Sequence, residues 1–157
     1  MLNTKYFIIS DEKGAKSLQV NPEPNGNAWF VENVQFVQSA NTESNWNFSL
    51  KEFEELQYTL YNVGDHYDWH HDCHNKPYEN KTIRKLSFTL CLNDEYEGGD
   101  FSICETHPIS EKTKVKSFAL KKGEMIVFPS HTWHKVNKVT KGIRKALVGW
   151  VVGKPFI

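Results

Sequence analysis

Apolar and polar residues alternate with a period of two along most of the chain after residue 55. The clearest case is the segment 84–92, in which every second residue is apolar: Leu86, Phe88, Leu90 and Leu92. Successive side chains of a β-strand point to opposite faces, so a period of two is typical of strands rather than of helices. This pattern predicts a protein built mainly from β-strands.

Eight strand-like runs follow one another in this part of the sequence. They cover residues 55–61, 67–71, 84–92, 100–103, 114–120, 125–128, 134–136 and 143–152. Turn-forming pairs such as Gly64-Asp65 and Gly98-Gly99 separate most of them. Short strands with regular turn signals are typical of an all-β sandwich or barrel, and a jelly roll has eight strands. We therefore expect an all-β (mainly β) fold with little helix.

The first fifty residues show weaker patterns. We expect strands near residues 6–10 and 28–37, with a turn rich in proline and asparagine between them. Residues 50–56 are compatible with a helical turn that Ser49 caps. This part of the chain is therefore expected to add supporting strands and loops to the main fold.

Length and composition restrict the possible classes of protein. The 157 residues are expected to form one domain, with supporting strands and loops at 1–54 and the β-rich core at 55–152. The 19 basic and 19 acidic residues balance, which argues against binding to nucleic acid through a basic surface. No apolar run approaches the ~20 residues of a membrane helix, and the apolar stretch at 6–9 is too short for a signal peptide. We expect a soluble, cytoplasmic protein that binds no membrane.

Two groups of histidines point to a metal site. His70 and Asp72 form an H-x-D pair whose side chains face the same way on a strand, and His134 lies in a second group far downstream. One His, one Asp and a second His from another strand form the facial triad of non-haem Fe(II) oxygenases, which leaves coordination positions open. Taken alone, His70 and Asp72 are more simply explained as polar residues at the rim of a β-barrel.

Further motifs place the H-x-D pair in a longer pattern. Five residues fit a Y-x-x-G-x-x-Y-x-x-H-x-D arrangement: Tyr61, Gly64, Tyr67, His70 and Asp72. Downstream come Arg84-Lys85-Leu86-Ser87, then Glu97-Gly98-Gly99-Asp100-Phe101, and then the run from Gly123 to Ser130 that leads to His134, Arg144 and Trp150. Over residues 55–152 these motifs resemble the prolyl 4-hydroxylase-like branch of the 2-oxoglutarate- and Fe(II)-dependent oxygenases. The resemblance implies a double-stranded β-helix, which is a jelly-roll barrel.

The resemblance also implies roles for individual residues. His70, Asp72 and His134 would bind Fe(II), and Arg144 on the last strand would bind the distal carboxylate of 2-oxoglutarate. A guanidinium suits this task because its planar fork pairs with a carboxylate through two hydrogen bonds. Further cosubstrate contacts are expected at Tyr61, Thr89 and Cys91. Cys91 departs from the family pattern, because many relatives have a tyrosine at this position.

The implied reaction hydroxylates a C–H bond and releases succinate and CO2. It would use Fe(II), with 2-oxoglutarate and O2 as cosubstrates and ascorbate as the reductant. A peptidyl proline is the substrate that the family implies, with another protein side chain or a small molecule as alternatives, and the protein is expected to be a monomer or a homodimer. The substrate pocket is expected to contain residues close to the ligand motifs: Trp69, Tyr67, His131 and Trp150.

Three other interpretations compete with this one. A cupin-type metal enzyme or binding module requires a Glu shortly after its first histidines, yet none occurs before Glu79, and Arg144 would have no role. An interaction domain with relic ligands is not supported, because all three ligand positions are filled. Nucleic-acid demethylases of this superfamily usually carry a second arginine on the last strand, where this chain has Lys145.

Overall fold

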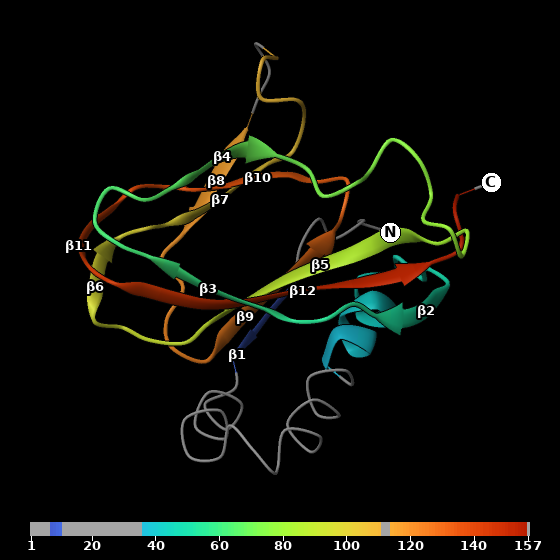
Figure 1. Ribbon diagram of the computed structural model, residues 1–157, viewed down its shortest axis with the longest axis horizontal. Helices are drawn as coiled ribbons and strands as arrows, with labels where there is room; N and C mark the ends of the chain where they lie inside the picture. Colours follow the sequence, from blue (N-terminus) through green and yellow to red (C-terminus); the bar gives the residue numbers. More distant parts are fainter. Residues whose placement is uncertain (1–6, 11–35, 111–113, 157) are drawn as a thin grey trace.

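The structure of the protein is a computed structural model that describes residues 7–10, 36–110 and 114–156. Two β-sheets face each other, and a helix at residues 36–43 lies against the outer face of the larger sheet (Figure 1). The strands in chain order are β1 (Phe7–Ser10), β2 (Leu50–Phe53), β3 (Gln57–Tyr61), β4 (Tyr67–His70), β5 (Ile83–Cys91), β6 (Tyr96–Gly98), β7 (Phe101–Cys104), β8 (Val115–Phe118), β9 (Glu124–Pro129), β10 (Trp133–Val136), β11 (Val139–Gly142) and β12 (Arg144–Gly153).

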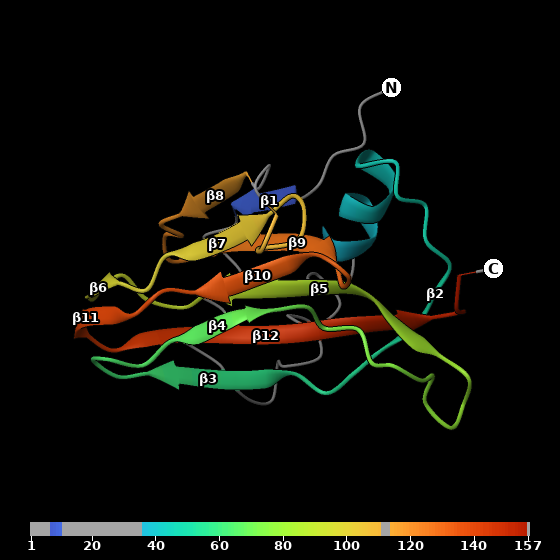
Figure 2. The ribbon, with the colours of Figure 1, turned by 90° about the horizontal axis from the view of Figure 1, so that it is seen from above.

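The strand order is that of an antiparallel jelly roll, as the sequence predicted. The larger sheet contains β1, β9, β5, β12 and β2 in that order, and β3 also pairs with β12. The smaller sheet has the order β4, β10, β7 and β8, and β6 pairs with β11 in a two-stranded ribbon. The edge strands β3 and β4 lie on the same side of the two sheets (Figure 2). The site described below lies next to these two strands.

The eight strands predicted from the alternating pattern are all present, with small changes at their ends. They correspond to β3, β4, β5, β7, β8, β9, β10 and β12, and the strand expected near residues 6–10 is β1. The sequence pattern did not predict the ribbon of β6 and β11. These are short strands of three and four residues that pair with each other, so they carry little alternation of their own.

Two expectations for the N-terminal part are wrong. Residues 50–53 form β2 rather than a helical turn, because the end of β12 offers them a pairing partner and Phe53 lies opposite Val151. Residues 36 and 37, expected at the end of a strand, belong to the helix, and residues 28–35 of that predicted strand lie outside the described residues. Val37 and Ala40 are fully buried on one side of this helix, so apolar residues here pack against the sheet in a helical spacing.

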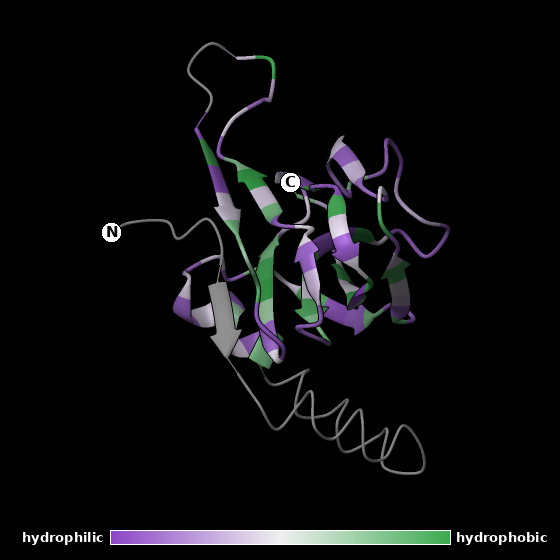
Figure 3. Cartoon of the chain, turned by 90° about the vertical axis from the view of Figure 1, so that its left-hand side faces the viewer, coloured by the Kyte–Doolittle hydropathy of each residue, from purple (hydrophilic) through white to green (hydrophobic). Residues whose placement is uncertain are grey.

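Strand β5 separates the hydrophobic core from the functional face of the sheet. On one face, Leu86, Phe88 and Leu90 join the core cluster that contains the helix residues. On the other face, Ser87 and Thr89 line a cavity between the two sheets. Figure 3 shows that hydrophobic residues gather along the strands, whereas most connections are hydrophilic. The alternation found in the sequence therefore assigns one face of β5 to stability and the other to the site.

Among the described residues, no helix is long and apolar enough to cross a membrane.

The packing of β12 against the core gives a stability prediction. A Cβ atom at Gly149 would overlap the ring of Phe88 and lie 2.8 Å from Leu56 Cδ2. Because Phe88 is buried and cannot move freely, Gly149→Ala should lower the free energy of unfolding by about 1–3 kcal/mol. Thermal melting should show a decrease of roughly 2–4 °C per kcal/mol. Lys145→Ala, at an exposed position of the same strand, is the control and should melt close to the unsubstituted protein.

Candidate active site

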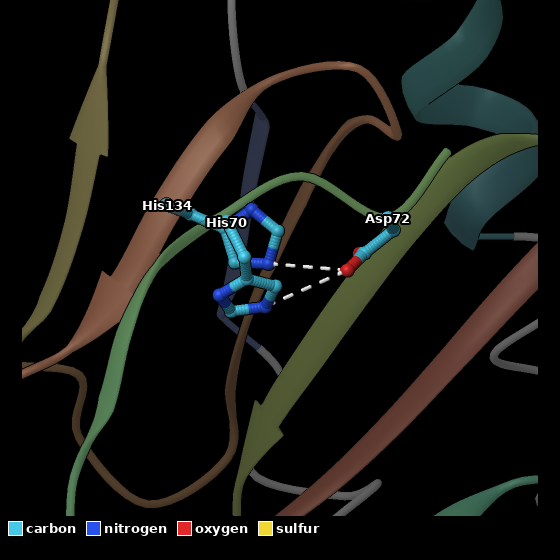
Figure 4. A group of neighbouring side chains, drawn as sticks. All are labelled: His70, Asp72 and His134. Carbon is cyan, nitrogen blue, oxygen red and sulfur yellow. Dashed lines mark ion pairs between the residues drawn. The ribbon is translucent and has the colours of Figure 1, made fainter. Parts of the chain in front are cut away.

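Three possible metal ligands meet in the interior between the sheets (Figure 4). His70 ends β4, Asp72 follows it by two residues, and His134 lies on β10 directly opposite His70. Their ligand atoms all lie within 4.8 Å of one another. Asp72 Oδ1 is 3.6 Å from His70 Nε2 and 3.5 Å from His134 Nε2. The pairing of β4 with β10 thus joins the H-x-D pair to the downstream histidine.

Both imidazoles are oriented by the backbone. His70 Nδ1 lies 2.7 Å from the Asp68 carbonyl oxygen, and His134 Nδ1 lies 2.8 Å from the Thr132 carbonyl oxygen. A carbonyl can only accept, so each Nδ1 donates a hydrogen bond to the backbone, and each Nε2 faces the carboxylate of Asp72. Burial and then the proximity of His134 lower the pKa of His70, which favours the neutral imidazole that a metal requires.

The carboxylate of Asp72 is held on the side away from the histidines. Its Oδ2 accepts hydrogen bonds from Ser87 Oγ at 2.6 Å and from Trp150 Nε1 at 3.0 Å. Burial alone would raise the pKa of Asp72. The hydrogen bond and charge of His134 and the hydrogen bonds from Ser87 and Trp150 outweigh burial, so this pKa lies well below its ordinary value. Asp72 is therefore ionised at neutral pH, and its Oδ1 is available to a cation.

The three residues line a cavity of about 540 Å³ between the two sheets. This volume is within the range of small-molecule sites. Side chains from both sheets form its walls, and the apolar ones among them include Phe101, Phe128, Val136 and Val148. Apolar walls around a charged cluster exclude water, so electrostatic interactions inside the cavity are stronger than at a surface.

Arg144 lines the same cavity from the start of β12. It is only 1% exposed, and its Nε and Nη2 have no hydrogen-bond partner among the described residues. These two N–H groups form one edge of the guanidinium, the edge that binds both oxygens of a carboxylate. Arg144 lies opposite Tyr61 of β3, with Cζ 5.3 Å from the centre of the tyrosine ring. A buried and unpaired guanidinium is unfavourable unless an anion enters the cavity.

Four more residues expected at the site also line the cavity: Tyr61, Thr89, Tyr67 and Trp150. Tyr61 and Thr89 lie on β3 and β5, the two strands that pair with β12 on either side of it. Tyr61 lies directly opposite Arg144, and Thr89 lies opposite Val148, further along the same face of β12. Tyr67 packs against the ligand cluster, with its ring centre 3.9 Å from that of His70.

The thiol of Cys91 has partners in the protein other than the expected cosubstrate. Cys91 is fully buried but is not among the residues that line the cavity. Its Sγ lies 3.2 Å from the Asn93 carbonyl oxygen and 3.3 Å from the Leu120 carbonyl oxygen, with Tyr96 Oη at 3.4 Å. The thiol is thus already engaged by main-chain carbonyls and packs as a small buried residue.

Trp69 and His131 are also absent from the lining of this cavity. Trp69 precedes His70 on β4 and therefore faces the other way, where Lys135 Nζ lies 4.9 Å from the ring centre. His131 lines a separate cavity of about 400 Å³, together with Trp46 and Trp133. Their proximity to the ligands in the sequence therefore does not make them part of the wall of the ligand cavity.

The sequence analysis did not identify Arg84 as a residue of the cavity. On a regular strand, Arg84 would share the face of Leu86 and point toward the core. However, Leu86 pairs with Val151 and Arg84 pairs with Val152, so Lys85 is an extra residue in the ladder. This bulge turns Arg84 toward the cavity, where its Cζ lies 3.9 Å from the centre of the Trp150 ring. No local signal in the sequence marked the bulge.

Comparison with known families identifies the class of protein. The sequence model of the 2OG-Fe(II) oxygenase superfamily matches residues 56–152, which is more than half of the chain. The chain therefore belongs to the 2OG-Fe(II) oxygenase superfamily, and the resemblance found in its motifs is confirmed.

The relatives include hydroxylases of the PKHD type. One from Synechococcus sp. (strain CC9311) is 44% identical over 87 residues, which are 54% of this chain and 36% of the relative. Another, from Idiomarina loihiensis, is 33% identical over 103 residues, which are 64% of this chain and 43% of the relative. The chain thus spans less than half the length of these relatives.

Solved structures support the fold. A prolyl-4-hydroxylase from Pseudomonas putida has a TM-score of 0.68 at 18% identity, covering 97% of this chain and 88% of its own. The viral collagen prolyl hydroxylase from Paramecium Bursaria Chlorella virus-1 has a TM-score of 0.68 at 17% identity, covering 96% and 97%. At these identities the likeness concerns the fold alone.

The hydrogen bonds to Asp72 Oδ2 lead to a prediction about metal affinity. Ser87→Ala removes the shorter of the two bonds and lets the carboxylate rotate away from the histidines. Co(II) affinity, measured by competition with a fluorescent chelator, should fall about tenfold. Ser102→Ala is a matched control, since Ser102 is also a buried serine on a strand but bonds to Ser117 instead. Equal affinities for the two variants would contradict the role assigned to Ser87.

Proposed function

We propose that this chain is an Fe(II)- and 2-oxoglutarate-dependent hydroxylase. His70, Asp72 and His134 hold Fe(II), and Arg144 binds the distal carboxylate of 2-oxoglutarate. The observation that carries this proposal is the buried, unpaired edge of Arg144 in the same cavity as the ligand cluster. A metal site alone would fit many proteins, whereas a metal site with an unpaired buried guanidinium requires an anionic ligand.

The donor set fits Fe(II). Two imidazole nitrogens and one carboxylate oxygen converge from one side, which is the facial triad that leaves the other coordination positions open. The hydrogen bonds of the two Nδ1 atoms orient the imidazole rings, and Oδ1 of the ionised Asp72 lies within 3.6 Å of both Nε2 atoms, so the three donor atoms already converge. We infer that the site is organised before the metal binds.

The cavity also fits an oxo dicarboxylate. Arg144 provides the partner for one carboxylate, and the hydroxyl groups of Tyr61 and Thr89 provide neutral hydrogen-bond donors near it. The iron and its cosubstrate supply the oxidising chemistry that replaces a C–H hydrogen by a hydroxyl group and yields succinate and CO2. The protein orients both through Arg144 and the three ligands, and its apolar walls keep water from this chemistry.

The proposed substrate is a peptidyl, prolyl-type residue. The curated relatives are hydroxylases, and several solved proteins of the same fold are prolyl hydroxylases. One of them, from Trichoplax adhaerens, was solved in complex with a peptide fragment of hypoxia inducible factor. Ascorbate as the reductant, a monomeric or homodimeric state, and a division into a supporting segment 1–54 and a catalytic core 55–152 are part of the same proposal.

A cupin-type metal enzyme without 2-oxoglutarate is the alternative. It would use the same three ligands but would give Arg144 no anion to bind, although Arg144 is buried in the ligand cavity. The match to the oxygenase family over residues 56–152 also favours the first proposal.

Removal of a ligand tests the metal site. His70→Ala, Asp72→Ala and His134→Ala should each abolish iron-dependent formation of succinate from 2-oxoglutarate, because two remaining ligands hold the ion too weakly. Succinate can be quantified by mass spectrometry, and candidate peptides can be examined for a gain of one oxygen atom from labelled O2. Full succinate production by His134→Ala would show that the triad is assigned incorrectly.

Arg144 should affect the cosubstrate more than the metal. Arg144→Ala leaves a buried carboxylate without its partner, a loss of roughly 3–5 kcal/mol, so 2-oxoglutarate should bind a few hundred-fold more weakly. Arg144→Lys should recover part of this affinity, since an ammonium replaces a planar fork by a point charge. Calorimetric titration of the Mn(II)-loaded protein measures both. Unchanged affinity in Arg144→Ala would revive the cupin alternative.

A further inference from the structure

Glu54, in the link between β2 and β3, neutralises the second arginine of the cavity. Its Oε2 lies 2.9 Å from Arg84 Nη2 and 3.0 Å from Arg84 Nε, and its Oε1 lies 3.2 Å from Nε. The carboxylate therefore occupies the same guanidinium edge that, in Arg144, has no hydrogen-bond partner among the described residues. The side chains of Arg84 and Glu54 are only 18% and 22% exposed, so water screens this pair less than a surface pair.

Neighbouring groups fix Glu54 in this position. Tyr78 Oη donates a hydrogen bond of 2.6 Å to Oε1, and His74 Nε2 lies 3.1 Å from Tyr78 Oη. The backbone N–H of Glu54 donates to the Trp150 carbonyl oxygen at 2.9 Å. The carboxylate is thus held from both of its oxygens and through its own backbone, which makes the neutralisation of Arg84 a built feature of the cavity wall.

The two arginines occupy distant parts of one cavity. Arg84 stacks on Trp150, whose indole N–H binds the metal-ligand carboxylate of Asp72. Arg144 and Trp150 are six residues apart on β12, which corresponds to roughly 20 Å along a strand. A five-carbon dicarboxylate is too short to reach both arginines. A single anion in this cavity can therefore bind only one of the two arginines. It binds Arg144, because the Nε and Nη2 edge of Arg84 is already paired with Glu54.

We propose that Glu54 is a specificity-determining residue of this site. By neutralising Arg84 it leaves Arg144 as the binding group for the carboxylate of the cosubstrate, and it makes the part of the cavity beside Trp150 a place for an uncharged portion of the substrate. This inference rests on the proposed function, because it assumes that Arg144 receives 2-oxoglutarate.

The charge distribution defines a class of substrate. A free amino acid or carboxylic acid would bring a carboxylate next to Arg84, whose Nε and Nη2 edge is already occupied by Glu54, so the ligand carboxylate approaches a neutralised pair. An internal residue of a peptide has its amino and carboxyl groups in amide bonds and brings no carboxylate to this pair. Glu54 thus favours a residue within a peptide chain and also prevents 2-oxoglutarate from occupying the place of the substrate.

Binding stoichiometry tests the inference. Mn(II)-loaded protein, titrated with 2-oxoglutarate in a calorimeter without O2, should bind one equivalent. Glu54→Gln keeps the size of the side chain but leaves the charge of Arg84 without its partner. A second equivalent of 2-oxoglutarate should then bind, with an affinity about tenfold or more above that of any second binding to the unsubstituted protein. Glu54→Ala is measured in parallel, and circular dichroism checks that both fold. The double variant Glu54→Gln with Arg84→Gln should return to one equivalent.

Two matched controls separate the charge effect from a structural one. Glu52→Gln alters a nearby carboxylate on β2. Glu52 accepts a hydrogen bond from Asn80, which lies in the connection between β4 and β5 as Tyr78 does, and it is not the partner of Arg84. Tyr78→Phe removes a hydrogen bond to Glu54 and leaves its charge in place. Both should bind one equivalent. The inference is overturned if neither Glu54 variant binds a second equivalent, or if the second equivalent survives without Arg84. Absence of any binding by the unsubstituted protein would instead refute the proposed function.

Discussion

The pairing of β5 with β12 is the interaction on which the rest of the structure depends. The two strands pair over most of their length and form the centre of the larger sheet. Their outer faces carry the core that packs against the helix, and their inner faces carry Ser87, Thr89, Arg144 and Trp150. Because antiparallel pairing sets the relative position of every side chain along the two strands, the same ladder that stabilises the sheet also aligns the groups of the site.

Burial of charge is the second constraint, and it explains the polar contacts of the site. Asp72 and Arg144 are ionic groups in a cavity with apolar walls, and each must be compensated. Hydrogen bonds from Ser87 and Trp150 and the proximity of the two histidines compensate Asp72. The Nε and Nη2 atoms of Arg144 have no hydrogen-bond partner within the described residues, which leaves this edge of the guanidinium for an anionic ligand. The unpaired edge of Arg144 lowers the stability of the fold, and it is this edge that the proposed binding of a carboxylate requires.

Much of the fold was predictable because strand periodicity is a local property. The eight alternating runs became eight strands of the jelly roll, and the H-x-D pair and His134 lie together as the resemblance implied. The errors arose where partners in space overrode local preference. Residues 50–53 extend along β12 because its end offers hydrogen bonds, and residues 36–43 form a helix because Val37 and Ala40 pack together against the sheet. A single-sequence pattern contains neither of these partners.

The sequence by itself determined the alternation of β5 and, through its motifs, the candidate ligand set and the candidate arginine, because these depend on residue type and on spacing along the chain. Only the tertiary structure decided which neighbours complete the site. A bulge at Lys85 turned Arg84 into the cavity, and the thiol of Cys91 contacts two main-chain carbonyl groups and does not line the cavity. Glu54 reached Arg84 from a segment thirty residues earlier. Register shifts and pairings between distant segments are set by the balance of packing and hydrogen bonding across the whole fold, so no local motif encodes them.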